Sequence, residues 1–413
     1  MDRPHLNRLT FLTAAVSLAV SGAASASGFR LPENSIAGLG TSNALVANST
    51  ELGALTYNPA GMSFHKKSGA VAGLMDINLD LKVDPQGGTP TDSTGKDNIG
   101  VPNGYFVGQL QNGWAWGLGI SAPFGLETRW PAGTFPLFNA TGTGALAPEH
   151  SKIAVLNFNP NVSKRISPNT SVAFGVDFYN AKSMVFNTQG VAIDGTGEGT
   201  GFNLAVLHRA GDWSFGGSYR SQVDVDINGQ VSGAPATTSI TFPWMLQVGA
   251  QYQATKALAL EFDIERTGWS KFDKLVIKAP VAPAPANLIT STNNWSDSNA
   301  YRFGGTYQIA PRTQLRFGLA LDKTPQGDSY YSARVPDADR KLYSIGIAQD
   351  MGGWSLEAGY MRVEFDDRTV NNPAGSYATR LGSGNYDPNG TDAYNGKYSA
   401  SVNLYGIGVS TTF

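Results

Sequence analysis

Residues 71–83 read VAGLMDINLDLKV, a run in which apolar and polar side chains alternate. Such alternation is typical of a β-strand with one apolar and one polar face, because successive side chains of a strand point to opposite sides. The pattern returns at residues 223–228, 258–265 and 315–322. In each run we interpret the apolar face as lipid-facing and the polar face as wet, which is the arrangement of a transmembrane β-barrel.

Composition points to an all-β chain. The 413 residues include 49 Gly, 22 Pro and 16 Tyr, and only 15% are charged, which favours strands and turns over helical bundles. The 30 basic and 32 acidic residues give a net charge of -2, which argues against a nucleic-acid partner because phosphate binding needs clustered Lys and Arg. The absence of cysteine excludes disulfides, thiolate metal sites and a cysteine nucleophile.

The first 26 residues have the three parts of a secretory signal peptide. Arg3 and Arg8 form a basic start, residues 9–20 are an apolar stretch, and Ala24-Ser25-Ala26 is a small-residue cleavage site. The apolar stretch is too short for a bilayer-spanning helix, which needs about 20 residues. We therefore expect residues 1–26 to be removed. No later apolar run is long enough to span as a helix, so the mature chain is either periplasmic or crosses the outer membrane as strands.

Fourteen segments carry strand signals. They lie near residues 68–84, 104–111, 113–121, 152–165, 170–182, 200–209, 212–228, 240–253, 257–279, 299–309, 313–323, 339–351, 353–366 and 396–413. Tight turns at residues 111–113, 167–169, 210–212, 254–256, 310–312 and 351–353 alternate with longer loops. Outer-membrane barrels have short periplasmic turns and long external loops, so we expect a 14-stranded antiparallel transmembrane β-barrel with both mature termini periplasmic.

Aromatic residues mark the expected membrane boundary. Trp114, Trp213 and Trp354 each follow a tight turn, where a ring would lie at the periplasmic interface. The last residue, Phe413, resembles the aromatic end of outer-membrane barrel chains. A soluble β-sandwich explains the alternation equally well, but it does not explain the loop pattern, the tryptophans and the terminal Phe together.

A series of short motifs runs from one end of the chain to the other. They are Ser27-Gly28-Phe29-Arg30-Leu31, Ala37-Gly38-Leu39-Gly40, Tyr57-Asn58-Pro59-Ala60-Gly61-Met62, Ala122-Pro123-Phe124-Gly125-Leu126, Tyr219-Arg220-Ser221, Trp269-Ser270-Lys271-Phe272, residues 297–301, and Pro336-Asp337-Ala338-Asp339-Arg340. In this order they resemble the FadL family of hydrophobic-compound transporters. The resemblance implies an outer-membrane channel for passive uptake of long-chain fatty acids or similar hydrophobic small molecules. It also implies a plug of residues 27–67 inside a barrel of residues 68–413, with a ligand pocket at Phe29 and Leu31.

The hatch of such a plug would be the step Asn58-Pro59-Ala60. Proline holds φ and lacks an N–H, and asparagine can bond nearby backbone, so these residues would fix a turn. Neither residue performs chemistry. The alternative is that the whole N-terminal region is a disordered tail, which its many apolar residues disfavour.

A second step, Pro123-Phe124-Gly125, should interrupt strand pairing, because Pro123 cannot donate to a β-ladder and Gly125 has no side chain to pack. The resemblance implies an inward kink there and a lateral opening through the wall, by which the ligand leaves into lipid. Unpaired backbone facing lipid costs several kcal/mol per group, so the gap must be filled by the plug or line a passage. The alternative is an ordinary strand end that runs into the loop containing Trp130.

A fatty-acid carboxylate requires a cation in the pocket. Lys182 and Arg302 fall on the wet face of their predicted strands, with Asp322 as a candidate ion-pair partner. The alternative is that both cations only pair with lumenal acids.

No catalytic residue, metal or cofactor is expected. Outside the signal peptide the histidines His65, His150 and His208 are scattered, and neither a Gly-x-Ser-x-Gly elbow nor a His-Glu-x-x-His pair occurs. The run Gly195-Thr196-Gly197-Glu198-Gly199 carries no Walker lysine and is predicted to be a loop.

Other functions stay open: uptake of monoaromatic hydrocarbons by the same mechanism, a surface adhesin or phage receptor, and a general porin. The plug and the motifs argue against the last two. Residues 187–201 are rich in Gly, Thr and Asn and predict a compact external loop, which leaves the external capture site and the substrate undecided. The expected partners are a hydrophobic ligand and outer-membrane lipid, with the chain acting as a monomer.

Overall fold

The computed structural model describes residues 28–95, 98–279, 286–384 and 386–413. Its strands are β1 (Gly69–Pro85), β2 (Thr91–Asp92), β3 (Ile99–Gln109), β4 (Trp114–Arg129), β5 (Pro148–Ser167), β6 (Thr170–Thr188), β7 (Ile193–Ala210), β8 (Trp213–Arg220), β9 (Val223–Val231), β10 (Ala234–Phe242), β11 (Met245–Gln253), β12 (Leu258–Thr267), β13 (Lys274–Ala279), β14 (Ala286–Thr292), β15 (Ser298–Ala310), β16 (Thr313–Asp322), β17 (Arg340–Asp350), β18 (Trp354–Phe365), β19 (Arg368–Val370) and β20 (Gly396–Thr412). The helices are α2 (Ile36–Gly40), α3 (Pro136–Ala140) and α4 (Ser376–Gly382), and the short 3-10 helices are η1 (Leu52–Thr56), η2 (Pro59–Phe64), η3 (Gln111–Gly113), η4 (Gly144–Leu146), η5 (Trp269–Lys271), η6 (Asp328–Tyr330) and η7 (Asp392–Tyr394).

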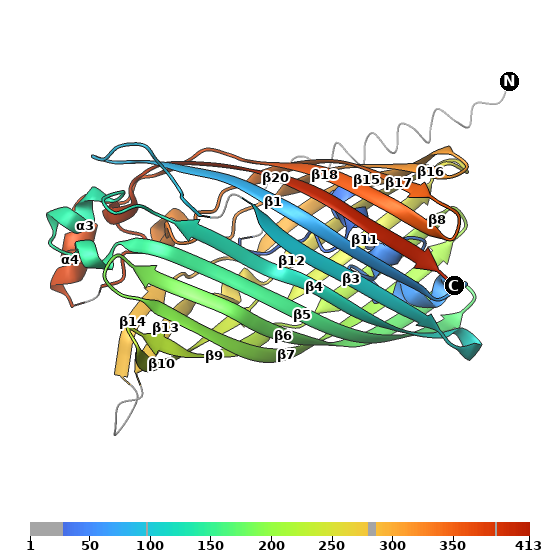
Figure 1. The fold of residues 1–413 in the computed structure, drawn as a ribbon, viewed down its shortest axis with the longest axis horizontal. Coiled ribbons are helices and arrows are strands. Elements are labelled where there is room, and N and C mark those ends of the chain that lie inside the picture. Colours follow the sequence, from blue (N-terminus) through green and yellow to red (C-terminus); the bar gives the residue numbers. More distant parts are fainter. Residues whose placement is uncertain (1–27, 96–97, 280–285, 385) are drawn as a thin grey trace.

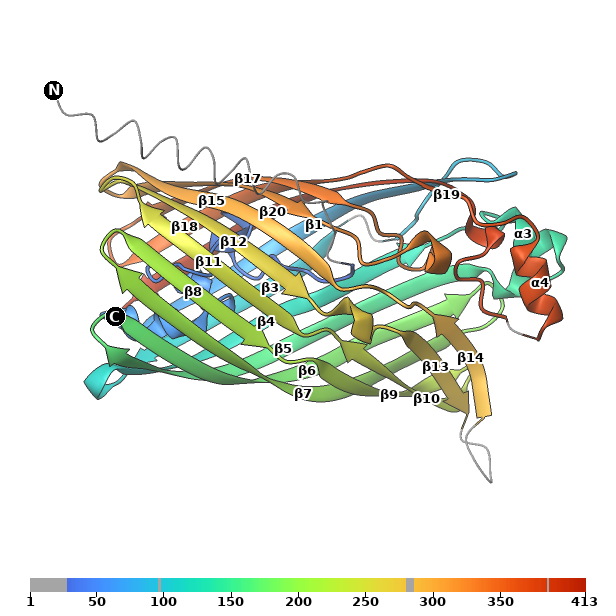
Figure 2. The ribbon, with the colours of Figure 1, turned by 180° about the vertical axis from the view of Figure 1, so that it is seen from behind.

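The strands form one closed antiparallel barrel (Figures 1 and 2). Closure comes from β1, which pairs with β3 on one side and along its whole length with β20 on the other. The barrel has 14 strands, as predicted. Four of them are interrupted and divide into β8 with β9, β10 with β11, β12 with β13, and β14 with β15, while β2 and β19 are short pieces paired near the loops.

All six predicted tight turns lie between neighbouring strands at one end of the barrel, which we call the turn end; the opposite end is the loop end (Figure 1). Trp114, Trp213 and Trp354 begin β4, β8 and β18 at the turn end, and between 39% and 44% of each is exposed. Phe413 also lies there, where its N–H donates to the Ser68 carbonyl. The described chain begins elsewhere, because Gly28 lies in the lumen against Trp269. The predicted mature start near Ser27 lies outside the described residues, so the periplasmic position of the mature N-terminus stays a prediction.

One predicted loop is a strand. Residues 193–201, including Gly195, Gly197 and Gly199, belong to β7, which pairs with β6 and with β9. The error arose because these inward-facing positions are glycines, which carry no apolar side chain to show the period of two.

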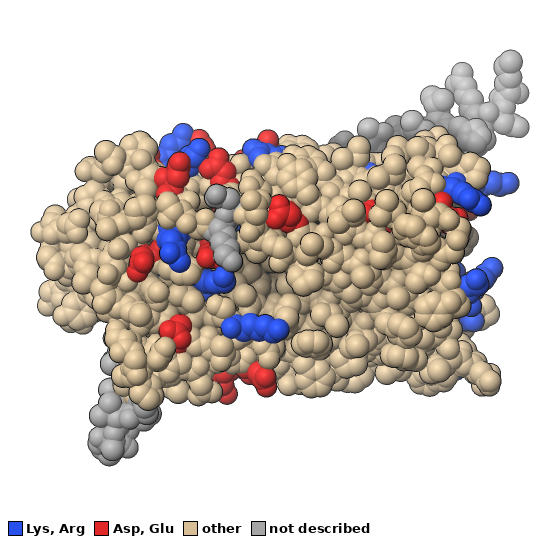
Figure 3. Space-filling model, viewed as in Figure 1, with Lys and Arg blue, Asp and Glu red and all other residues tan. Residues whose placement is uncertain are grey.

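Toward the turn end, the alternation has its expected direction. In β12 the acidic side chains of Glu261, Asp263 and Glu265 are buried in the lumen, while Phe262 and Ile264 point outward. Other outward-facing apolar residues continue this apolar belt around the barrel: Trp116, Leu118, Phe158, Phe174, Phe178, Phe202, Leu204, Phe215, Leu246, Leu319, Ile345, Leu356 and Ile407. On the face in Figure 3, charged side chains gather toward the loop end and at the turn end, with few in the band between.

Toward the loop end, the alternation is reversed. In β9 the apolar Val223, Val225 and Ile227 are buried in the lumen, whereas Asp224 and Asp226 point outward. The outer part of β1 is arranged in the same way, so the interpretation of its apolar face as lipid-facing is wrong. Outside the membrane the wall contacts water, and the apolar face is therefore stable only when it is turned inward.

The loops at the loop end pack over the barrel and include α3 and α4 (Figure 1). Their aromatic side chains form one buried cluster, in which the rings of Phe138 and Tyr377 lie 5.0 Å apart. Inside the barrel, residues 28–67 form a plug of α2, η1 and η2 that is almost entirely buried. No helix in the described part of the chain is long and apolar enough to cross a membrane.

Candidate functional site

The plug is fastened to the wall through Asn58. This buried residue begins η2, where its side-chain oxygen accepts a hydrogen bond from Ala60 N and Pro59 occupies the first helical position. Its Nδ2 donates to the carbonyl of Val46 within the plug (2.7 Å) and to the carbonyl of Val206 in β7 (3.0 Å). One amide thus joins two parts of the plug to each other and to the barrel.

A series of inward-facing glycines lets the plug backbone approach the wall. A Cβ atom added at Gly216 would collide with the carbonyl oxygen of Val46, and one at Gly318 would collide with the backbone of Thr41. The plug backbone also lies close to Gly304 and Gly346, and plug side chains lie close to Gly73, Gly249, Gly359, Gly406 and Gly408. Sequence reasoning missed this feature, because only the spacing of glycines on lumenal positions could have indicated it.

Phe29, at the start of the plug, lies in an aromatic cluster. Its ring centroid is 4.7 Å from that of Trp269, 5.2 Å from Phe272 and 5.7 Å from Trp295. Phe124 of the predicted kink lies 6.0 Å away and completes the contact with β4. The predicted pocket residue Phe29 and the predicted kink residue Phe124 therefore lie side by side in this cluster.

The wall is interrupted beside Phe124. Pairing of β4 with β3 ends at Ile120, while β3 continues alone against β1. Beyond that point the plug takes the place of β3: Leu31 N donates to the Pro123 carbonyl (2.8 Å), and Gly125 N donates to the Phe29 carbonyl (3.1 Å). The backbone groups left by the interruption are thus partly satisfied from inside the barrel.

A cavity of about 1620 Å³, counting the part open to solvent, passes through this interruption. Phe29 and Leu31 line it from the lumen, and Ile99 with Pro102 of β3 line it on one side of the gap. Its outward-facing lining includes Leu156 and Lys182, which lie on the outer faces of β5 and β6.

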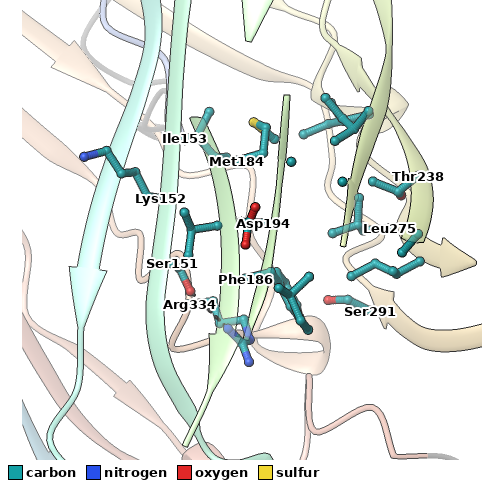
Figure 4. A pocket seen from close by; sticks show the side chains of 18 of the residues that line it. Ser151, Lys152, Ile153, Met184, Phe186, Asp194, Thr238, Leu275, Ser291 and Arg334 are labelled. Carbon is teal, nitrogen blue, oxygen red and sulfur yellow. Dashed lines mark hydrogen bonds between the residues drawn. The ribbon is translucent and has the colours of Figure 1, made fainter. Parts of the chain in front are cut away.

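A second, largely apolar pocket of about 800 Å³, counting the part open to solvent, lies closer to the loop end (Figure 4). It lies between the wall strands β5 to β7, β9, β10 and β13 and the loop that follows β16. We call it the outer pocket. Ile153, Met184, Ile240 and Leu275 contribute apolar side chains, and Arg334 lies at one end. The outer pocket shares Leu126, Lys152, Ile153 and Val335 with the cavity at the interruption, so the two are neighbours.

The two cations predicted for the pocket lie in different places. Arg302 is buried in the lumen, where its Nη2 is 3.4 Å from Glu265 and 3.9 Å from Asp322. Arg30 of the plug pairs with the same Glu265. Lys182, in contrast, points out of the barrel and is exposed, so its assignment to the lumen is wrong. The apolar side chains of β6 near Lys182 face inward because this part of the wall lies beyond the apolar belt.

The turn end of the lumen is polar. A vestibule of about 1250 Å³, counting the part open to solvent, lies between the plug and the wall there. Arg316 in its wall pairs with Glu51 of the plug (2.7 Å) and with Glu357 of β18 (2.6 Å). The described residues contain no cluster of three or more His, Cys, Asp or Glu that could hold a metal ion.

A 14-stranded barrel with an apolar belt, a lumenal plug and an apolar passage through its wall defines a transport protein of the outer membrane. The chain belongs to the family described as "Outer membrane protein transport protein (OMPP1/FadL/TodX)", whose model matches residues 17–413. This membership confirms the predicted family and its outer-membrane location, and the family is one of transporters rather than enzymes.

Known relatives agree with this assignment. The chain is 25% identical to the long-chain fatty acid transport protein of Escherichia coli strain K12, over 84% of this chain and 89% of that protein. Its fold is similar to that of a Pseudomonas aeruginosa FadL homologue, with a TM-score of 0.76 at 18% identity over 94% of this chain and 100% of that one. It is also similar to the toluene transporter of Ralstonia pickettii, with a TM-score of 0.65 at 16% identity over 92% and 99%.

Proposed function

We propose that this protein takes up long-chain fatty acids, or similarly hydrophobic small molecules, by passive diffusion across the outer membrane. The observation that carries the proposal is the contact between two apolar spaces, the outer pocket and the cavity that opens through the wall at Pro123, Phe124 and Gly125. A fatty-acid chain gains roughly 0.8 kcal/mol for each CH₂ that it buries, so it is more stable in such spaces than in a water-filled pore.

The proposed route begins in the outer pocket and continues past the aromatic cluster at Phe29 and Leu31. The ligand then leaves sideways between β3 and β4 into lipid. Residues 27–67 act as the plug with the hatch at Asn58, Pro59 and Ala60, residues 68–413 form the barrel, and residues 1–26 are the secretion signal. Residues 1–27 lie outside the described part of the chain, which begins at Gly28.

Exit through the turn end is unfavourable for an apolar ligand. The vestibule there is lined by charged and polar groups, including the Arg316 pairs with Glu51 and Glu357. A hydrocarbon chain would displace their water without replacing the hydrogen bonds, at a cost for each polar group left unpaired. Sideways exit carries less of this cost, because most of the cavity lining, including Ile99, Val101 and Leu156, is apolar.

Monoaromatic hydrocarbons are the second candidate ligands. The rings at Phe29, Trp269, Phe272 and Trp295 offer edge-to-face contacts to a small aromatic molecule. We propose that the chain works as a monomer with lipid as its other partner, because β1 and β20 close the barrel within one chain and both cavities lie within it.

Uptake of radiolabelled oleate and of toluene tests the proposal in cells that lack their own hydrophobic transporters, with and without this gene. An Asn58→Ala variant probes the hatch, and Asn371→Ala, at an exposed loop position, is the matched control. A fatty-acid channel with this hatch predicts saturable oleate uptake by the wild type. Asn58→Ala should change that uptake, and Asn371→Ala should leave it unchanged. Toluene uptake alone would assign the aromatic ligands, and no gain with either compound would refute the transport proposal.

A further inference from the structure

Arg334 holds a buried positive charge on the wall of the outer pocket. It lies in the loop between β16 and β17, and only 5% of the residue is exposed. Its Nη1 donates to Ser151 Oγ (3.2 Å) and to the Asn187 carbonyl (2.8 Å), and its guanidinium lies over the Phe186 ring at 3.8 Å. These contacts fix the side chain in one orientation without neutralising it.

The other fully buried arginines each have a carboxylate partner. Arg30 and Arg302 pair with Glu265, and Arg316 pairs with Glu51 and Glu357. For Arg334, no carboxylate oxygen of the described residues lies within ion-pair distance. Burial lowers the pKa of Arg334 to about 10, so the side chain stays positively charged at neutral pH.

The free side of this guanidinium meets the pocket. Its Nε and Nη2 make no hydrogen bond to any residue that the structure describes. Figure 4 shows the Arg334 nitrogens at one end of the pocket, with Ile153 and Met184 toward the other end. An extended apolar space with a single unneutralised cation at one end has the shape and charge distribution of a site for an amphipathic anion.

Two other charged residues line the pocket, and neither replaces Arg334. Lys152 lies 3.0 Å from Glu127, which also accepts from His150, so its charge is matched. Asp194 is exposed on the outward side of β7 and is hydrogen-bonded by Gln230.

We propose that Arg334 binds the carboxylate of the fatty acid, whose chain lies along the apolar wall of the outer pocket. This inference rests on the proposed function. It assigns to Arg334 the selection of anionic amphipaths over neutral hydrocarbons. A guanidinium presents a planar pair of N–H groups that fits a carboxylate, and a neutral ester or alkane leaves that charge unpaired in an apolar site.

Binding of radiolabelled oleate and of radiolabelled methyl oleate to the purified full-length protein tests the inference. The two ligands share the chain and differ in the charge of the head group. Arg334→Gln is expected to weaken oleate binding about tenfold or more while methyl oleate binding stays unchanged, and Arg334→Lys is expected to restore part of the oleate affinity. Arg266→Gln, at an exposed position of β12 that lines neither cavity, is the matched control and is expected to change neither ligand's affinity.

The outcomes separate this inference from the proposed function. If the wild-type protein binds neither ligand, the proposed function itself fails. If it binds both and Arg334→Gln loses neither, or loses both equally, Arg334 does not recognise the carboxylate and the inference is overturned. An equal loss would show that Arg334 only supports the fold of the loop.

Discussion

The Asn58 side chain links η2, the preceding plug segment and the barrel wall. Replacing it by aspartate keeps the acceptor for Ala60 N but removes both donors and places a carboxylate beside the carbonyls of Val46 and Val206. Each buried carbonyl left without its partner costs about 1–3 kcal/mol, so Asn58→Asp should loosen the plug. Swelling of liposomes in sugar solutions should show a leak for Asn58→Asp and none for Asn371→Asp. An Asn58→Asp barrel as tight as the wild type would contradict this role.

His65, at the end of the plug, should make the fold sensitive to acid. Burial, together with the nearby Arg209 guanidinium, lowers the pKa of His65 from 6.5 to about 4. The folded value lies below the unfolded one, so the stability contribution of neutral His65 is present above pH 6.5 and is lost as the pH falls toward 4. The loss is about 3 kcal/mol at most. The thermal unfolding temperature in detergent should therefore fall more steeply between pH 7 and 4 for the wild type than for His65→Gln. An equal fall of the unfolding temperature in both proteins would disprove the effect.

The basic residues show how far the orientation of single side chains could be predicted from the sequence. Arg302 was placed in the lumen correctly because it lies where polar side chains face inward, whereas Lys182 lies where they face outward. The sequence does not show at which height along the barrel the apolar side chains change from facing outward to facing inward. Apolar and polar residues alternate with a period of two both within the apolar belt and toward the loop end. Arg334 lies in a loop, where no period exists to assign a face. Its burial depends on packing between the loop and β5 and β6, which one sequence does not show.

At the scale of the elements, β8 offers a test of the contact between plug and wall. Gly216 faces the lumen, where an added Cβ would meet the Val46 carbonyl, while its neighbour Gly217 faces outward and has only a Val206 methyl at 3.4 Å. Gly216→Ala should displace the plug, because backbone atoms cannot yield as a flexible side chain can. Gly217→Ala is the matched control on the same strand. We expect sugar leakage and a lower unfolding temperature for the first variant only, and equal behaviour of the two would show that the plug tolerates the extra volume.

Most strands, by contrast, could be predicted from the sequence. Their alternation and the Gly- and Pro-containing turns are local signals, and all six turns lie at the predicted positions. The prediction failed at residues 193–201, where inward glycines replace the apolar signal, and at β14, which an interruption separates from β15, the rest of its barrel strand. The bridge of the plug to β4 through Arg30 and Phe124 is a contact of high sequence separation, which propensity cannot reveal.

The interruption between β3 and β4 provides a test of the exit route. Ala122 lines the apolar cavity there, and Ala348 lines the polar vestibule at the turn end. Ala122→Trp should fill the passage and reduce oleate uptake toward that of cells without the gene, while oleate binding by the purified protein persists. Ala348→Trp adds the same side chain to the other exit and should leave uptake intact. The opposite pattern would place the exit at the turn end.

At the scale of the whole molecule, the barrel meets different surroundings along its axis, and each determines the direction of its side chains. Within the apolar belt the outside is lipid, so apolar residues face outward and the acidic face of β12 binds the plug, with Asp263 accepting from Val46 N (3.0 Å). Toward the loop end the outside is water, so the apolar face turns inward and forms the outer pocket. The proposed ligand site is thus a consequence of extending the barrel beyond the membrane.

This placement of the membrane can be tested on β7, which crosses from one zone to the other. Leu204 lies in the apolar belt with 47% of its surface exposed, and Glu198 points outward in the zone toward the loop end. A lysine on the lipid face costs about 2–4 kcal/mol at the bilayer midplane and little outside it. Leu204→Lys should therefore destabilise the barrel by about this amount in denaturant titrations of protein folded into lipid vesicles. Glu198→Lys should change the free energy of unfolding only slightly, because that side chain stays in water. Equal losses in the free energy of unfolding for the two variants would mean that lipid reaches the level of Glu198. The outer pocket would then lie within the membrane, and a ligand could enter it from lipid rather than from water.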